Sequence, residues 1–480
     1  MKNGLGLIFL LLFLGIISVL RAPRKNKRKL KRVALEWTWA IFAATLFLWG
    51  AFKGGSFQTP SQMEWVSPPA LGFQWGPLFL GVDGVSLFFL ILTSLLTPLC
   101  ILVSWTSIKF LFKEFLLCLL FLEVLLIGVF SVLDLLLFYI LFEGILIPMF
   151  LLIGVWGSRE EKVRASYYFF FYTFFGSVFM LLGLLKLYTI VGTTDYQALL
   201  HTDLPSSSQK WIFLGFFLSL AVKIPQVPFH IWLPQAHVEA PVSGSVFLAG
   251  VLLKLGGYGF LRFTWPIFPG ASEYFAPLII MLSVTAIIFG GLTTCRQVDL
   301  KRLIAYSSVA HMGLVTLSLF THTIEGLGGA VYMMLGHGVV SSALFIVVAY
   351  LYERHGTRLI KYYRGLSFSM PLLGVVFLVL TLTNMAVPLS CNFVAEFFSL
   401  LSVFEYNLIA CLFATSGMIV GATYSLYLYN RVSFGSPSNY LLFTRDLSRR
   451  ELLAISPLIF LIFILGLVPP LIFDHIKNVI

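Results

Sequence analysis

The chain has 480 residues, of which 59% are hydrophobic and only 11% are charged, and its mean hydropathy is +0.94. A soluble globular protein carries roughly 25% charged residues, so this composition cannot solvate the surface of a water-soluble fold. It excludes a cytosolic enzyme, a disordered protein and a nucleic-acid-binding module, and it leaves an α-helical polytopic membrane protein. The net charge of +11 is typical of a membrane protein whose basic residues gather in the loops on one side.

Apolar runs separated by charged or Pro/Gly-rich breaks predict about fourteen transmembrane helices. Helices are expected because an open sheet cannot satisfy its backbone in lipid, and a barrel would show short alternating segments instead. The first span has its basic residues after its apolar core, unlike a cleaved signal peptide, so we expect it to be retained. The predicted spans are 4–20, 33–52, 84–105, 113–131, 135–156, 166–190, 211–231, 242–261, 274–294, 302–320, 327–351, 371–401, 407–430 and 452–473.

The distribution of basic residues supports this number of spans. If the loop after the first span is inside, the loops on that side hold 24 of the 32 Lys and Arg residues, the opposite side holds five, including Arg262, and three lie within spans. This bias follows the positive-inside rule and predicts that both termini are outside. No arginine falls well inside a predicted span, and Asp299, Lys301 and Arg302 are expected to be surface anchors.

The spans divide into an N-terminal segment, two similar halves and a C-terminal segment. The fourth to eighth spans and the ninth to thirteenth spans number five each, so the two halves are oppositely oriented. Pro225 and Pro228 interrupt the seventh span, and Pro388 interrupts the twelfth. Paired broken spans in inverted halves point to an ion pathway near the midplane. The predicted parts are 1–112, with three helices; 113–262, the first antiporter-like repeat; 263–431, the second; and 432–480, a loop and the last helix.

Four charged residues are predicted at membrane depth: Glu143, Lys223, Lys254 and Glu396. Each would cost about 2.5–3.5 kcal/mol if left without compensation. A static buried ion pair, such as Glu143 with Lys223, is one explanation. The other is a proton relay, to which lysine is suited because burial and a nearby carboxylate move its pKa in opposite directions, whereas arginine stays charged.

The residues around Lys223 and Lys254 favour the proton relay. The two prolines after Lys223 open the helix, and freed carbonyls at this depth need water or protein partners. A kink used only for packing is the alternative. Lys254 lies among Gly250, Gly256 and Gly257, which allow close helix approach and leave room for water.

Histidines provide further groups that can accept a proton near neutral pH. His311 and His337 lie within late spans, while Glu123, His230 and His237 form a second tier of candidates. For the histidines, the alternative explanation is a ring that only forms hydrogen bonds with a neighbouring helix. A bis-histidine haem site is not expected, since no paired histidines occur on two helices.

No motif for a nucleotide, flavin or metal is present. The sequence has no phosphate-binding loop, no GxGxxG after a strand and no cluster of metal ligands. Its five cysteines lie at least 18 positions apart, which excludes iron–sulfur ligation and a disulfide framework. We therefore expect no cofactor or metal on this chain, and an energy source in a partner chain or an ion gradient.

Four sequence runs resemble the antiporter-like membrane subunits of respiratory complex I, most of all the mitochondrial type of plants or algae. The resemblance covers nearly the whole chain, and departures include Gln235, where an acid is expected, and SCN at 390–392. It implies a polar axis formed by the residues Glu143, Lys223, Lys254, His311, His337 and Glu396. The runs are SLAVKIPQVPFHIWLPQAHVEAPVSGSVFLAGVLLKLGGYG, RQVDLKRLIAYSSVAHMG, LGHGVVSSALF and CNFVAEFF.

The resemblance implies a proton-translocating subunit in the membrane arm of NADH:ubiquinone oxidoreductase that itself carries no redox centre. NADH, FMN, iron–sulfur clusters and ubiquinone would belong to partner subunits. The expected partners are other membrane-arm subunits, including neighbouring antiporter-like chains, and lipids, but no nucleic acid. The expected location is the mitochondrial inner membrane, with the basic loops facing the matrix and both termini on the intermembrane-space side. The alternatives are a subunit of a cation/proton antiporter and a purely structural subunit with static buried pairs.

Overall fold

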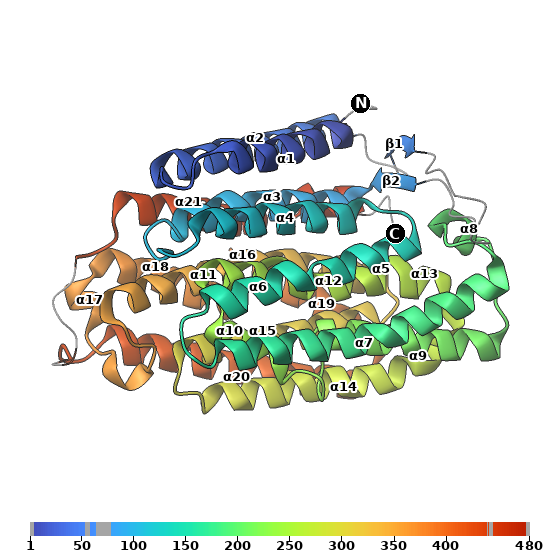
Figure 1. Ribbon diagram of the computed structural model, residues 1–480. Helices are drawn as coiled ribbons and strands as arrows, with labels where there is room; N and C mark the ends of the chain where they lie inside the picture. Colours follow the sequence, from blue (N-terminus) through green and yellow to red (C-terminus); the bar gives the residue numbers. More distant parts are fainter. Residues whose placement is uncertain (1–3, 53–57, 64–77, 439, 441–444, 477–480) are drawn as a thin grey trace.

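A computed structural model describes residues 4–52, 58–63, 78–438, 440 and 445–476. The helices lie roughly along one common direction and form an elongated bundle (Figure 1). Eleven of the described helices are long and apolar enough to cross a membrane, which confirms the predicted class of helical membrane protein. Every predicted span overlaps at least one helix, whereas the number fourteen and the inverted repeats stay predictions.

The N-terminal part contains two helices at one edge of the bundle, a small sheet and a third, buried helix (Figure 1). Asn26 ends the basic turn between the first two helices and accepts a hydrogen bond from the Lys29 N–H, which fixes where the second helix begins. The two strands pair antiparallel, a small addition to the expected all-helical architecture. The elements are α1 (Gly4–Arg21), α2 (Lys27–Ala51), β1 (Gln58–Met63), β2 (Leu78–Val82) and α3 (Gly84–Val103).

The following part ends in one composite span, Val242–Ile267, in which two short π-helical segments alternate with α-helix. The predicted break of the seventh span is present, because one helix ends at Lys223 and the next begins at Trp232. The elements are α4 (Phe112–Ser131), α5 (Leu135–Gly144), α6 (Leu146–Trp156), α7 (Lys162–Val191), α8 (Tyr196–Leu200), α9 (Ser206–Lys223), α10 (Trp232–Glu239), α11 (Val242–Phe247), η2 (Leu248–Leu252), α12 (Leu253–Gly259), η3 (Phe260–Thr264) and α13 (Trp265–Ile267).

The last part also contains a broken span. Its two pieces end at Asn384 and begin at Cys391, on either side of Pro388, as the sequence predicts. The elements are α14 (Pro269–Cys295), α15 (Leu300–Leu319), α16 (Ile324–His355), η4 (Ile360–Tyr362), α17 (Leu366–Ser369), α18 (Pro371–Asn384), α19 (Cys391–Tyr406), α20 (Leu408–Ser433), α21 (Arg449–Leu467) and α22 (Pro470–Ile476).

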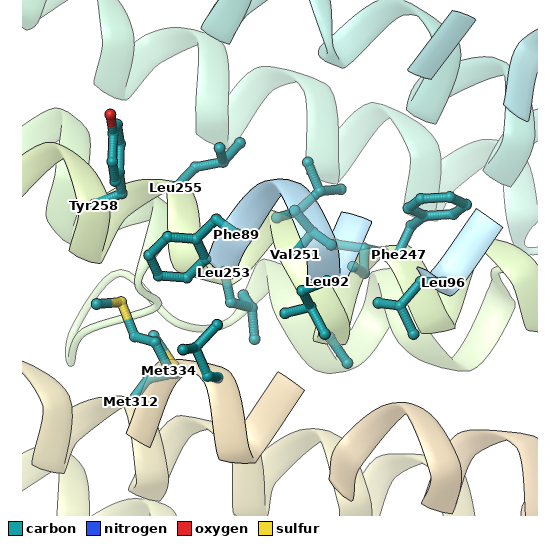
Figure 2. Close-up of a cluster of buried hydrophobic side chains, with 14 of the residues drawn as sticks. Phe89, Leu92, Leu96, Phe247, Val251, Leu253, Leu255, Tyr258, Met312 and Met334 are labelled. Atoms are coloured by element: carbon teal, nitrogen blue, oxygen red, sulfur yellow. The ribbon is translucent and has the colours of Figure 1, made fainter. Parts of the chain in front are cut away.

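The core of the bundle lies around the composite span and α16, both of which are buried along their apolar length. Apolar side chains from α3, η2, α12, α15 and α16 meet there, among them Phe89, Val251 and Met334 (Figure 2). Glycine is needed where helices touch: a Cβ at Gly257 would lie 2.3 Å from the Met334 sulfur, and one at Gly256 would lie 2.5 Å from Ile224 Cγ1. The central span is thus held in close contact on two sides.

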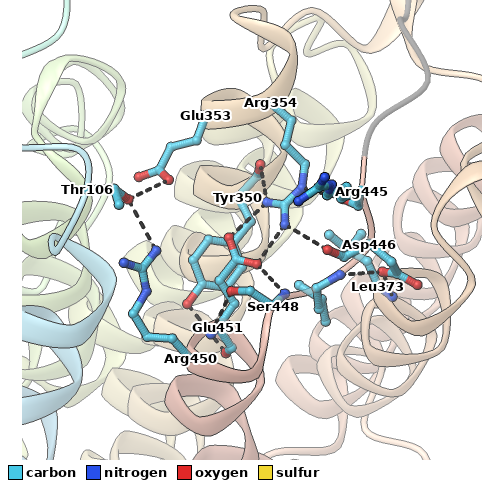
Figure 3. A network of polar contacts seen from close by, with 11 residues as sticks. Thr106, Tyr350, Glu353, Arg354, Leu373, Arg445, Asp446, Ser448, Arg450 and Glu451 are labelled. Atoms are coloured by element: carbon cyan, nitrogen blue, oxygen red, sulfur yellow. Dashed lines mark hydrogen bonds and ion pairs between the residues drawn. The ribbon is translucent and has the colours of Figure 1, made fainter.

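A polar network attaches the last long helix to the bundle (Figure 3). Arg354, at the end of α16, donates two hydrogen bonds to the Glu451 carboxylate, at 3.0 and 2.6 Å. Glu451 also completes a capping box with Ser448 at the start of α21. Arg450 donates to Thr106, after the end of α3. These contacts therefore attach α21 to the end of α16 and to the segment after α3, both of which are distant from it in the sequence.

The structure corrects the expected place of Arg262. This residue lies inside the bundle with 3% exposure, because the eighth span continues to Ile267 instead of ending near 261. It forms an ion pair with the fully buried Asp83, which also N-caps α3. Tyr258 accepts a hydrogen bond from Arg262 Nε at 3.2 Å. One arginine is therefore present within a span, and its charge is compensated.

We predict that Arg262→Met strongly destabilises the fold, because it leaves the Asp83 carboxylate buried without its cation. The expected loss is about 3–5 kcal/mol, seen as a lower thermal midpoint of the detergent-solubilised protein. The double variant Asp83→Asn/Arg262→Met should recover much of the loss, since Asn keeps a capping oxygen without the charge. Equal midpoints for Arg262→Met and the unaltered protein would contradict this assignment.

Candidate functional site

Lys254 lies on α12 at the centre of the bundle and is fully buried. Its ammonium group donates to the Ala249 carbonyl and lies 2.9 Å from His337 Nδ1. The nearby Gly338, on α16, lets that helix approach the span of Lys254 closely, because a Cβ there would lie 2.9 Å from the Gly250 carbonyl oxygen. The central lysine is thus held by a carbonyl of its own span and by one histidine of α16.

A row of polar groups continues from this lysine to α19. The rings of His337 and His311 lie 5.6 Å apart between centroids. His311 Nδ1 lies 3.4 Å from Glu396 Oε1, and a pocket beside these two residues is also lined by Asn384 and Tyr424. The structure therefore brings together four of the predicted site residues, Lys254, His337, His311 and Glu396, from four different helices.

The other two predicted residues, Lys223 and Glu143, form no ion pair or hydrogen bond with this row or with each other among the described residues. Lys223 ends α9 and is 3% exposed, and its ammonium lies over the Phe142 ring, 4.5 Å from the centroid. Glu143 is half-buried near the end of α5, and its Oε1 has no hydrogen-bond partner among the described residues. Within the described part of the chain these two side chains form no direct ion pair, although each is within electrostatic range of the other. The static Glu143–Lys223 contact is therefore not observed.

The break after Lys223 is held by a tryptophan. Trp232 begins α10, is almost fully buried, and donates from its indole N–H to the Val222 carbonyl at 2.9 Å. That carbonyl is one of those that the end of α9 leaves without a helical partner. The tryptophan thus fixes the end of the helix that carries Lys223.

The second-tier candidates are all buried. Glu123, on α4, accepts a hydrogen bond from Thr97 at 2.7 Å through one carboxylate oxygen. His230 lies in the break between α9 and α10, with its ring near Phe289. His237 is fully buried on α10, and neither ring nitrogen has a partner among the described residues.

The sequence-based expectation missed buried cations near the ends of spans. Lys301 is only 3% exposed, and its ammonium donates to the Ala240 carbonyl at 2.9 Å, so it is not the expected surface anchor. Arg358 is fully buried and donates to the Val238 carbonyl. Asp299 is buried too, while Arg302 is exposed as predicted. Hydropathy does not indicate that Lys301 and Arg358 are buried, because each lies in or next to a predicted loop. Their carbonyl partners, at Ala240 and Val238, are distant in the sequence and can be identified only in the folded chain.

The arrangement of these side chains is chemically able to transfer protons. Histidine and lysine side chains in hydrogen-bond or ring contact can exchange a proton after small rotations, with water completing the longer steps. Among the described residues, no group of three or more His, Cys, Asp or Glu side chains could hold a metal ion.

Comparison with known proteins identifies the family. Residues 132–421 match the family model described as NADH:quinone oxidoreductase/Mrp antiporter, transmembrane. The NADH-ubiquinone oxidoreductase chain 4 of Metridium senile is 79% identical, over 100% of this chain and 98% of that protein. The chain belongs to the NADH:quinone oxidoreductase/Mrp antiporter membrane family. The chain 4 proteins of Chondrus crispus and Arabidopsis thaliana are 50% and 47% identical, over 97% and 96% of this chain and 94% and 93% of theirs.

Solved structures of this family have the same fold. A chain of respiratory complex I from Thermus thermophilus with bound NADH aligns with a TM-score of 0.86 and 30% identity, covering 99% of both chains. A chain of the Mrp complex from Dietzia sp. DQ12-45-1b aligns with a TM-score of 0.88 over 99% of this chain and 96% of that one. The latter is only 19% identical, so it shows the shared fold alone.

We predict that Trp232→Phe destabilises the break after α9, because it leaves the Val222 carbonyl buried without its donor. The expected cost is about 1–3 kcal/mol, read from the thermal midpoint of the detergent-solubilised protein. The control is Trp211→Phe, since Trp211 is 77% exposed. Similar midpoints for the two variants would show that the indole hydrogen bond has no structural weight.

Proposed function

We propose that this chain is a proton-translocating membrane-arm subunit of NADH:ubiquinone oxidoreductase. The observation that carries the proposal is the buried row Lys254, His337, His311 and Glu396, in a chain 79% identical to a protein named as chain 4 of that enzyme. A row of this kind can hold and pass protons but cannot move electrons. Redox chemistry, with NADH, FMN, iron–sulfur clusters and ubiquinone, is assigned to partner subunits.

The proposed path has two parts. Glu143 and Lys223 load a proton near the break after α9, and the proton then reaches Lys254. From Lys254 it passes to His337, which lies 2.9 Å away. The proton continues through His311 to Glu396, while Glu123, His230 and His237 contribute from the sides. The spaces between Lys223 and Lys254 and between the two histidine rings would be bridged by water.

The proposed setting follows from the family and the charge distribution. We assign the chain to the mitochondrial inner membrane, with the basic loops on the matrix side and both termini on the intermembrane-space side. Residues 1–112, 113–262, 263–431 and 432–480 are proposed as its N-terminal segment, two inverted repeats and C-terminal segment. The neighbouring antiporter-like chains and other membrane-arm subunits are the proposed partners.

The proposed role of Lys254 is tested by Lys254→Ala in the assembled, membrane-reconstituted complex. We expect the initial rate of proton translocation to fall by about tenfold or more, together with the quinone reduction coupled to it. The matched control is Lys186→Ala, because Lys186 also lies on a membrane helix but is exposed. Full proton pumping by the Lys254→Ala complex would refute the function.

A second variant separates proton transfer by His337 from simple support of Lys254. His337→Gln keeps an amide oxygen that can accept from the Lys254 ammonium, but it removes the group that takes up a proton. We expect normal assembly, measured by native electrophoresis, and proton translocation reduced by about tenfold. Unimpaired translocation would favour the alternative in which the buried pairs are static.

A further inference from the structure

A pocket of about 190 Å³ opens at the end of the bundle where α6 meets α7, beside the end of α10 and the start of α15. It is lined by side chains of both charges, including Glu161, Arg164 and Arg302 at the exposed rim. These residues lie in or beside predicted inner loops. We call this cavity the inner pocket. Its volume is sufficient for several water molecules.

The wall of the inner pocket is a segment whose backbone is held at four successive carbonyls. Ser245 donates to the His237 carbonyl, Arg358 to that of Val238, the Ser158 N–H to that of Glu239, and Lys301 to that of Ala240. Two of these four donors are buried cations. Such extensive anchoring fixes the position of the side chains that project from the segment.

Val238 and Glu239 of this segment line the pocket, and Glu239 is the ionisable one. It is 97% buried, yet its Oε2 has no hydrogen-bond partner among the described residues. A buried carboxylate oxygen without a protein partner needs water or a proton. The surrounding charges are mixed: Arg358, Arg159 and Lys301 attract a negative charge on Glu239, and Glu161 repels it.

The residue two positions before it leads inward. His237 is fully buried, and its ring stacks on Phe345 with centroids 4.5 Å apart. Neither of its nitrogens has a partner in the described part of the chain. His237 is within electrostatic range of Lys301 on the pocket side and of Lys254 in the centre. It therefore lies within electrostatic reach of the central lysine and two positions before the pocket-lining Glu239.

The two polar side chains that α10 presents to the pocket, Gln235 and Glu239, differ in whether they can take up a proton. Gln235 lies one turn earlier on α10 and lines the same cavity, with its Oε1 also lacking a partner among the described residues. An amide cannot take up a proton at neutral pH. Of the two polar side chains that α10 presents to the pocket, only Glu239 can do so.

We propose that the inner pocket is the inlet through which protons reach the centre of this subunit, and that Glu239 takes them up from water and passes them to His237. The inference rests on the proposed function and adds to it a site where protons enter the chain. The step is a plain proton exchange: Glu239 takes a proton from a hydronium ion, which leaves as water, releases it through bridging water to a His237 ring nitrogen and returns to the carboxylate, and His237 gives the proton up again toward Lys254. No electron moves.

The test is Glu239→Gln in the assembled complex, reconstituted in vesicles, with proton translocation measured beside Lys254→Ala. We expect Glu239→Gln to lower the rate by about tenfold, while Glu239→Asp keeps most of it. Glu160→Gln is the matched control, because Glu160, next to Glu161 in the same loop, is an exposed acid that does not line the pocket; it should leave the rate unchanged. Gln235→Glu added to Glu239→Gln should restore much of the rate, since it returns an acid to the same wall.

Full translocation by Glu239→Gln, with Lys254→Ala inactive, would overturn the inlet while the proposed function stands. An equal loss in Glu160→Gln would also overturn it, because the effect would then be one of general charge. If Lys254→Ala translocates fully, the proposed function itself fails.

A second measurement leaves Glu239 in place, in case its replacement prevents assembly. Glu161→Cys, made in a Cys295→Ser background because Cys295 is exposed, is treated from the inner side with a bulky thiol reagent that does not cross membranes. Loss of proton translocation after modification of the introduced thiol would support the proposed inlet. Unchanged translocation after complete modification would overturn it.

Discussion

The cost of an uncompensated charge in a medium without water governs this structure. Buried ionisable groups are accommodated here in two ways: some have fixed hydrogen-bond or ion-pair partners, and others keep an oxygen without a protein partner in the described part of the chain. Arg262 and Lys301 have fixed partners, the Asp83 carboxylate and the Ala240 carbonyl. Glu123 and Glu239 each keep an oxygen without a protein partner among the described residues. The first way gives a rigid frame, and the second leaves positions at which water and protons can be exchanged.

This rigid frame depends on close helix packing around the composite span Val242–Ile267. Glycines at 256 and 257 let the composite span approach α9 and α16 closely, and this contact brings Lys254 to hydrogen-bond distance of His337. At this depth the lysine ammonium has two partners, the Ala249 carbonyl of its own span and the histidine of α16. Close packing and the polar row are therefore two aspects of the same arrangement.

Much of this could be predicted from the sequence, because long apolar runs and prolines act locally. The breaks near Pro225 and Pro388 lie where predicted, and Lys254 with His337 could be selected as charged or polar groups within apolar runs. Arg262 and Lys301 could not, because Arg262 follows the expected end of one span and Lys301 precedes the expected start of another, each by a single residue. Whether such a residue faces solvent or the interior depends on how far the helix continues and on which distant group meets it. For Arg262 that group is Asp83, 179 positions away.

The π-helical segments on either side of Lys254 have a consequence for variation in chain length. A π turn accommodates one residue more than an α turn. Losing one residue within Leu248–Leu252 could therefore be absorbed by straightening that turn to α-helix, with the lysine still pointing at its histidine. The same deletion in the regular turn beyond it would swing the ammonium group by roughly 100° around the helix axis. Single-residue deletions in homologous genes should therefore be tolerated in this span at its widened turns and not in the regular turn between them.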